Sequence, residues 1–139
     1  MNVLLEHPYI QKLLTLDLPR TDYVIAGSGP LFARGWIDDP GDIDVVARGA
    51  AWDIAQQLGE TSQAPHSSVL QIELFDGAVE ILNGWFPEVW SVDTLIDEAD
   101  IIEGIRFVRL SVVATTKKRL QRERDLEHLR VMEKHGYQF

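Results

Sequence analysis

The sequence predicts an α/β (α+β) fold in which helices pack against a mixed, mostly antiparallel β-sheet. Short apolar runs that end at glycine alternate along the chain with apolar stripes of helical spacing. Near the middle, the dipeptide Asp76-Gly77 separates two extended runs, which is typical of a β-hairpin. The chain has 139 residues, of which 45% are hydrophobic, enough for one core but not for two ordinary domains. We therefore expect a single domain over 1–139, with its core at 22–110 and closing helices at 111–136.

The first half is expected to alternate helices and strands. Pro8 suits the first turn of a helix that covers Tyr9 to Leu16. A buried strand begins at Tyr23 and breaks at the glycines that follow Ala26. The expected segments after it are a short helix (31–36), a strand (42–46), a helix ended by Gly59 (51–58) and a polar loop in which His66 is a surface histidine (61–68).

A hairpin is expected at the start of the second half. The runs 69–75 and 78–82 pair across the two-residue turn, and this register sets Glu73 directly opposite Glu80. Like charges so placed repel each other. Either this face is well solvated, or a cation or an active-site water lies over it.

The remaining segments are expected to be mainly helical. Ser91 starts a short helix, and 105–110 form the last strand. From Ser111 onward the residues Val112, Val113, Thr116 and Leu120 form a helical apolar stripe, but Leu126, Leu129 and Met132 do not continue it in phase, with the break near Gln121 to Glu123. We therefore expect two closing helices, or one helix with a kink.

A glycine turn follows the first strand and precedes a pair of aspartates. Gly27, Ser28 and Gly29 predict a tight turn with bare backbone N–H groups, which is a favourable environment for an anion. Asp42 and Asp44 share one face of the next strand, with Cα atoms about 6.6 Å apart. Carboxylates at this separation converge on one or two hard cations. A phosphate cradle beside a carboxylate pair indicates metal-dependent phosphoryl chemistry.

These residues also resemble a known signature. An apolar residue, Gly27 and Ser28, then thirteen residues, then two aspartates that alternate with apolar residues are similar to the motif of the polymerase-beta-like nucleotidyltransferase superfamily. The resemblance covers about 22–134 and implies the minimal nucleotidyltransferase fold. It implies magnesium-dependent transfer of a nucleoside monophosphate from a nucleoside triphosphate to an acceptor hydroxyl or phosphate.

The resemblance implies a role for three carboxylates. Asp42 and Asp44 would hold two Mg²⁺ ions that clamp the phosphate. The superfamily uses a third carboxylate on a neighbouring strand, and Glu80, between Val79 and Ile81, matches that position better than Glu73. Glu80 would complete the ligand set and help to deprotonate the acceptor.

The nucleotide-binding residues are also implied by the resemblance. Gly27 and Ser28 would bind the triphosphate tail, and Lys117 would neutralise charge on the leaving pyrophosphate. Arg122 lies in a segment similar to the closing turn of the superfamily. Arg34, on the helix after the glycine turn, is expected to reach towards the phosphates.

Three positions depart from the pattern of small superfamily members. Asp38 and Pro40 stand where an arginine and a threonine or serine often precede the Asp pair, and Gln121 replaces the usual glycine of the closing turn. Asp38 adds negative charge where a cation is expected.

The charge distribution bears on the class of partner. The net charge is −9, but 1–105 carry −14 while 106–139 carry +5. A largely acidic domain repels a polyanion, so binding of duplex DNA is not expected. The basic tail is either a local element that holds a triphosphate or simply a solvated helix face.

Composition also limits the compartment and the metal chemistry. The chain has no cysteine, which excludes disulfides and zinc-thiolate sites and leaves carboxylates as metal ligands. It has no apolar run of membrane-spanning length, and its first ten residues lack the features of a signal peptide. We expect a cytoplasmic protein with no membrane contact.

The expected function is thus nucleotidyl transfer to an unknown acceptor, which is a small molecule, a protein or an RNA. Two alternatives stay open. One is a catalytically inactive nucleotide-binding module, which Asp38 and Pro40 favour. The other is a toxin–antitoxin or regulatory protein that acts with a partner protein.

Overall fold

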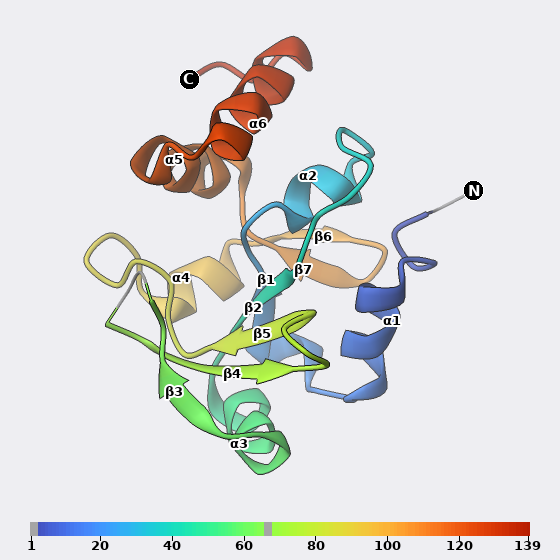
Figure 1. The fold of residues 1–139 in the computed structure, drawn as a ribbon, viewed down its shortest axis with the longest axis vertical. Helices are drawn as coiled ribbons and strands as arrows, with labels where there is room; N and C mark the ends of the chain where they lie inside the picture. The colour runs from blue at the N-terminus through green and yellow to red at the C-terminus, as the bar shows by residue number, and fades with distance from the viewer. Residues whose placement is uncertain (1–2, 66–67) are drawn as a thin grey trace.

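The fold is a mixed sheet with helices on both faces, seen in a computed structural model that describes residues 3–65 and 68–139 (Figure 1). In chain order the elements are α1 (Pro8–Thr15), the 3₁₀ helix η1 (Arg20–Asp22), β1 (Tyr23–Ile25), α2 (Gly29–Ala33), β2 (Ile43–Ala47), α3 (Gly49–Leu58), β3 (Thr61–Gln63), β4 (Leu70–Leu74), β5 (Val79–Leu82), α4 (Val92–Asp97), β6 (Asp100–Ile102), β7 (Ile105–Phe107), α5 (Leu110–Leu120) and α6 (Glu123–Lys134). Within those described ranges, no helix has the length and apolarity needed to cross a bilayer.

The sheet confirms the predicted mixed α+β architecture. The seven strands found in the described residues have the order β3-β4-β5-β2-β1-β7-β6. Four of their six pairings are antiparallel, whereas β1 with β7 and β2 with β5 are parallel. The parallel pair β2 and β5 matters most here, because it aligns Asp44 with Glu80.

Side-chain alternation divides the core between the two faces of the sheet. Ile43 and Val45 of β2 belong to the core beneath α1 and α3, whereas Val46 belongs to the core beneath α4 and α5. Since neighbouring residues of a strand face opposite ways, Asp44 lies on the α5 side together with Val46. Its partner Glu80 alternates with buried Val79 and Ile81 in the same way.

The hairpin has the predicted register. Glu73 pairs with Glu80 and Leu74 pairs with Val79. Asp76 and Gly77 have φ values of 57° and 89°, as a type I′ turn requires.

The edges of the sheet differ from the prediction. The segment expected to be a polar loop contains β3, whose three residues are all exposed and pair with β4 through the backbone. Asp100–Ile102 form β6, for which no strand was expected, and the strand expected over 105–110 ends at Phe107 because Leu110 begins α5. His66 lies outside the described residues.

The helices follow their apolar stripes, with one correction in α6. α1 lies within one residue of its expected range, α3 begins two residues earlier than predicted, and α2 begins two and ends three residues earlier than predicted. In α6, Met132 is buried and Leu129 packs against the core as predicted, but Leu126 is 43% exposed while Asp125 and His128 are buried. The buried face of α6 is therefore partly polar.

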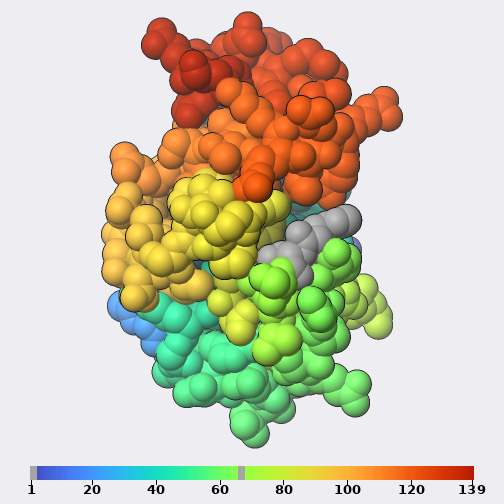
Figure 2. Space-filling model, turned by 90° about the vertical axis from the view of Figure 1, so that its left-hand side faces the viewer, coloured from blue at the N-terminus to red at the C-terminus, as the bar shows by residue number. Residues whose placement is uncertain are grey.

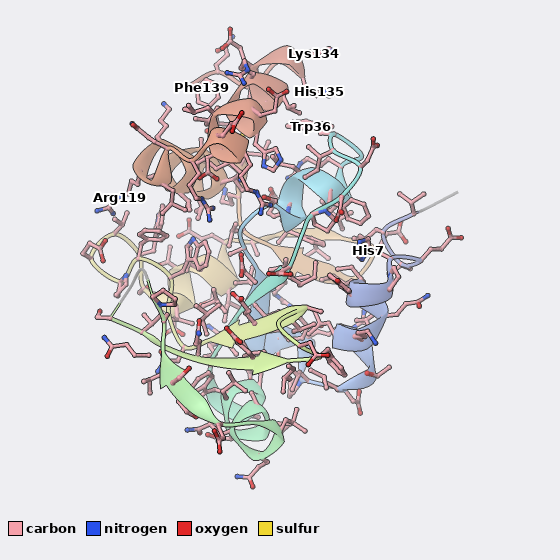
Figure 3. The ribbon with its side chains drawn as sticks, in the orientation of Figure 1. His7, Trp36, Arg119, Lys134, His135 and Phe139 are labelled. Atoms are coloured by element: carbon pink, nitrogen blue, oxygen red, sulfur yellow. The ribbon has the colours of Figure 1, made fainter. Side chains whose placement is uncertain are left out.

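The last two helices pack together at one end of the molecule (Figures 1 and 2). The predicted break lies at Gln121 and Arg122, between the end of α5 and the start of α6. Near the end of α6, the ring of His135 stacks on Trp36, with centroids 4.7 Å apart and planes 3° apart (Figure 3). This contact joins the chain after α6 to the loop after α2.

Gln121 holds the break between the helices in a left-handed conformation, with φ 51° and ψ 29°. Such a residue with a Cβ is strained by roughly 1–2 kcal/mol, whereas glycine is not. Gln121→Gly should therefore raise the free energy of unfolding by about 0.5–1 kcal/mol, measured by urea denaturation. Lys118→Gly, inside α5, should instead lower it by about 1 kcal/mol. If both variants had a lower free energy of unfolding than the parent, the inference that Gln121 is strained would be wrong.

Candidate functional site

A polar cavity of about 260 Å³ lies between the sheet and the last two helices. It collects seven of the eight residues that the sequence assigned to a site, together with residues of the hairpin and the closing helices. Its walls are formed by Gly27, Ser28, Pro40, Asp42, Asp44, Pro65, Gln71, Glu73, Glu80, Trp85, Thr116, Lys117, Leu120, Arg122, Arg124 and Asp125.

The glycine turn forms one side of the cavity. Gly27 has a φ of 62°, and a Cβ at this position would overlap Oδ2 of Asp44. Glycine is therefore required both by the backbone and by the close approach of the carboxylate. In the part of the chain that the structure describes, the N–H groups of Gly27 and Ser28 donate to no protein acceptor. They remain available to an anion.

Three carboxylates from β2 and its approach and from β5 lie beside the glycine turn. Asp42 is exposed just before β2, and Asp44 lies within β2 on the same face. Glu80 is the register partner of Asp44 on β5, and the two side chains share a hydrogen bond. Glu73 also lines the cavity from β4.

Crowding of these carboxylates changes the ionisation of Asp44. Burial, the negative charge and hydrogen bond of Glu80, and the charge of Asp42 together raise the pKa of Asp44 to about 8. The positive charge of Arg124 opposes this shift. Burial and the charges of Asp42 and Glu73 also raise the pKa of Glu80, although its hydrogen bond with Asp44 acts the other way. Near neutral pH, Asp44 thus donates a proton to Glu80.

A buried cation from α5 faces the glycine turn. Lys117 is only 3% exposed, and its Nζ lies 3.0 Å from Oγ of Ser28 and 3.3 Å from Oδ1 of Asp125. Burial lowers the pKa of Lys117, and the charge of Asp125 opposes that change. Burial alone would raise the pKa of Asp125, but the hydrogen bonds of Arg122 and the charge of Lys117 outweigh it and lower that pKa. The pair is therefore ionised, with Lys117 aimed at the turn.

Two arginines complete the positive side. Arg122 donates to Asp125 from Nε at 2.7 Å, and its side chain remains half exposed at the cavity rim. Arg124 Nη2 lies 3.3 Å from both Ser28 Oγ and the carbonyl of Pro40. Arg124 thus spans the cavity between the glycine turn and the loop before β2.

Two sequence expectations about charge need correction. Arg34 does not line the cavity, because its guanidinium donates to Asp100 at 2.8 Å and to the carbonyl of Pro30. Arg124 lies in the cavity wall where Arg34 was expected. Asp38 is exposed and is not part of the cavity wall, so its negative charge does not lie at the site.

His128 was not identified by the sequence. It is buried on α6, and its Nδ1 lies 3.3 Å from Ser28 Oγ. Burial, with the positive charges of Lys117 and Arg124, lowers the pKa of His128 to about 4. Ser28 already accepts from both of those cations, so its hydroxyl proton points to the neutral imidazole. Asp125, His128 and Met132 are three and four residues apart and so share one face of α6. This helical spacing is the sequence signal that would have placed His128 on the buried face.

The carboxylates suit magnesium by their chemistry. Mg²⁺ prefers oxygen ligands and binds one or two carboxylates together with substrate phosphates and waters. The described residues contain no preformed group of three His, Cys, Asp or Glu side chains around one metal position. A magnesium ion shared with a phosphate does not require one. The excess negative charge that raises the pKa of Asp44 fits a cation.

Comparisons of the chain with protein-family models, with curated proteins and with solved structures find no match. The function is therefore argued from the geometry of the cavity.

Replacing Asp44 should stabilise the protein in a pH-dependent way. Because the folded pKa is raised to about 8, the native state binds a proton that the unfolded state has already lost, and its stability falls as pH rises from about 4 to about 8. Asp44→Asn removes this loss of stability. The free energy of unfolding of the variant should therefore exceed that of the parent by about 1–3 kcal/mol at pH 8 and by less at pH 5. Urea denaturation at both pH values measures it, with the exposed Asp53→Asn as control. A less stable variant at pH 8 would indicate a structural role for the carboxylate.

His128 should have the opposite pH dependence. Its pKa is lowered to about 4, so the unfolded state gains a proton first and stability falls as pH decreases below about 6.5. In His128→Asn the loss between pH 7 and pH 5 should be about 2 kcal/mol smaller than in the parent, since asparagine accepts from Ser28 without titrating. Gln138→Asn, an exposed change after α6 that alters no titratable group, should leave the loss unchanged. Equal acid losses in all three proteins would mean that His128 is not held neutral.

Proposed function

We propose that the protein is a magnesium-dependent nucleotidyltransferase with the minimal nucleotidyltransferase fold. The observation that supports this is the meeting, in one cavity, of an unpaired amide turn, a carboxylate group and a buried lysine. Phosphoryl transfer needs these components, because catalysis depends mainly on positioning and on stabilising charge.

The topology supports the proposal at the level of the fold. The glycine turn directly follows β1, the Asp pair is at the start of β2, and Glu80 lies on β5, the parallel neighbour of β2. The arrangement agrees with the signature that the sequence resembles, in which a third carboxylate lies beside the pair.

The cations give the cavity an end that suits phosphate. The N–H groups of Gly27 and Ser28, which have no acceptor among the described residues, line the same cavity as Lys117, Arg122 and Arg124. In a chain of net charge −9, this concentration of positive groups is local. A triphosphate tail bound there would direct its α-phosphate towards the carboxylates.

The carboxylates would act on the reacting end. Asp42, Asp44 and Glu80 would hold magnesium, which supplies charge neutralisation at the phosphate when it is bound. Glu80 lies at the far side of the group from the glycine turn and would accept the proton of the attacking hydroxyl. Lys117 would stabilise the negative charge of the departing pyrophosphate.

A second candidate is nucleotide binding without turnover. It is favoured by the position of Ser28, whose hydroxyl contacts Lys117, Arg124 and His128. A phosphate must compete with these contacts within the protein. Binding without release of pyrophosphate would distinguish this candidate from the enzyme.

Turnover should depend on one hairpin glutamate more than on the other. With magnesium and a mixture of nucleoside triphosphates, Glu80→Gln should reduce pyrophosphate release at least about 100-fold, since it removes a carboxylate at the reacting end. Glu73→Gln, directly across the hairpin, should reduce it less than about tenfold.

Nucleotide binding is measured in parallel by thermal shift. A nucleotide at a hundredfold excess over its dissociation constant should stabilise the parent by about 2.7 kcal/mol. If magnesium and nucleotide gave no stabilisation and no pyrophosphate, the proposed function would be wrong. If Glu73→Gln had the larger effect and Glu80→Gln the smaller, the third carboxylate of the site would be Glu73.

A further inference from the structure

A smaller cavity of about 140 Å³ adjoins the polar cavity. Most of its described wall is apolar, and its polar groups come from the carboxylates, from buried Gln71 and from Arg122 at the rim. The wall consists of Asp44, Ala64, Pro65, Val69, Gln71, Glu80, Leu82, Gly84, Trp85, Phe86, Leu120 and Arg122.

The aromatic wall is held in place by α5. Trp85 Nε1 donates to Oγ1 of Thr116 at 3.1 Å, which fixes the orientation of the indole. The guanidinium of Arg119 lies 5.5 Å from the ring centroid of Phe86. On the face in Figure 2, the segment after β5 (yellow) lies directly beneath α5. These contacts form the wall without a ligand.

The backbone of this segment is strained. Phe86 has a φ of 46°, in the left-handed region that a bulky side chain rarely adopts. Strain of this kind is concentrated at ligand-binding positions. Gly84 is also constrained, because a Cβ there would lie 2.7 Å from Cγ1 of Val69.

The two cavities meet at the carboxylates. Asp44 and Glu80 line both, as do Pro65, Gln71, Trp85, Leu120 and Arg122, whereas Gly27, Ser28 and Lys117, all within the described residues, line only the larger. A group in the smaller cavity therefore reaches the carboxylates from the side away from the phosphate-binding turn. In phosphoryl transfer the attacking and leaving oxygens lie roughly in line, so this side belongs to the attacking group.

We propose that the acceptor substrate is a small molecule with one apolar or aromatic ring and a hydroxyl group, bound with the ring against Trp85 and Phe86. This inference rests on the proposed function and names its substrate class. The hydroxyl oxygen forms a bond to the α-phosphorus and gives its proton to Glu80. The bond from the α-phosphorus to the bridging oxygen breaks, and its electron pair leaves with pyrophosphate.

The size of the cavity favours this class over a macromolecule. An apolar cavity of about 150 Å³ accommodates a benzene ring. Ala64, Pro65, Val69, Leu82, Phe86 and Leu120 offer no side-chain hydrogen bond, so hydroxyls of a sugar against this part of the wall would lose their hydration. The acidic charge of 1–105 also disfavours an RNA chain as acceptor.

Binding is tested first, without nucleotide, by fluorine NMR of 4-fluorobenzyl alcohol. Binding to the parent protein should broaden the fluorine signal of the alcohol, with a dissociation constant in the millimolar range. The sugar analogue 3-fluoro-3-deoxyglucose should not bind. Phe86→Ala removes one wall and Leu120→Phe fills the space, so each should weaken binding at least about tenfold. Phe75→Ala, an exposed ring outside the cavity, is the matched control. Thermal unfolding establishes that each variant is folded.

Equal binding of the sugar, or binding that neither cavity variant weakens, would overturn the inference. The reaction is then tested with magnesium, nucleoside triphosphates and the same alcohol, by mass spectrometry of the nucleotidyl ester. Turnover with RNA ends or protein hydroxyls, but none with the alcohol, would overturn the acceptor class alone. Binding of the alcohol without any binding of triphosphate would overturn the proposed function, and the acceptor role with it.

Discussion

The hydroxyl of Ser28 is the point on which the structure of the site depends. Lys117 and Arg124 donate to it, and it donates to His128, so that one side chain of the glycine turn joins both closing helices to the sheet. The network also contains Asp125, which is fully buried and paired with Lys117. Loss of Asp125 would leave Lys117 as a buried cation without its paired carboxylate, at a cost of several kcal/mol. The network therefore fixes where α5 and α6 lie, and with them every cation of the cavity.

The carboxylate half of the site follows from local patterns in the sequence. Alternation along a strand places Asp42 and Asp44 on one face, and the turn Asp76-Gly77 sets the register of the hairpin. These rules act over a few residues and need no knowledge of the tertiary fold. They predict that Glu80 faces away from the core, which is what the structure contains.

The cationic half of the site is formed by contacts between residues about a hundred positions apart in the sequence, so local patterns do not predict it. A search for apolar stripes selects Leu126 for the buried face of α6, but the partner surface is the polar network, so His128 is buried instead. The expectation that Arg34 lies at the site was wrong for a related reason. Its partner Asp100 lies in β6, a short edge strand without the alternation of buried and exposed residues by which strands are recognised. Pairing through the backbone, as in β3 and β6, leaves little trace in the side chains.

The separation of charge along the chain has a consequence for synthesis. All the carboxylates that line the cavity from the sheet precede position 81, whereas its lysine and both of its arginines follow position 116. During translation the acidic strands leave the ribosome before the residues that counter their charge. The negative side of the cavity is thus present in the growing chain before its lysine and arginines, and once the strands pair Asp44 and Glu80 relieve their mutual repulsion by retaining a proton or binding a cation.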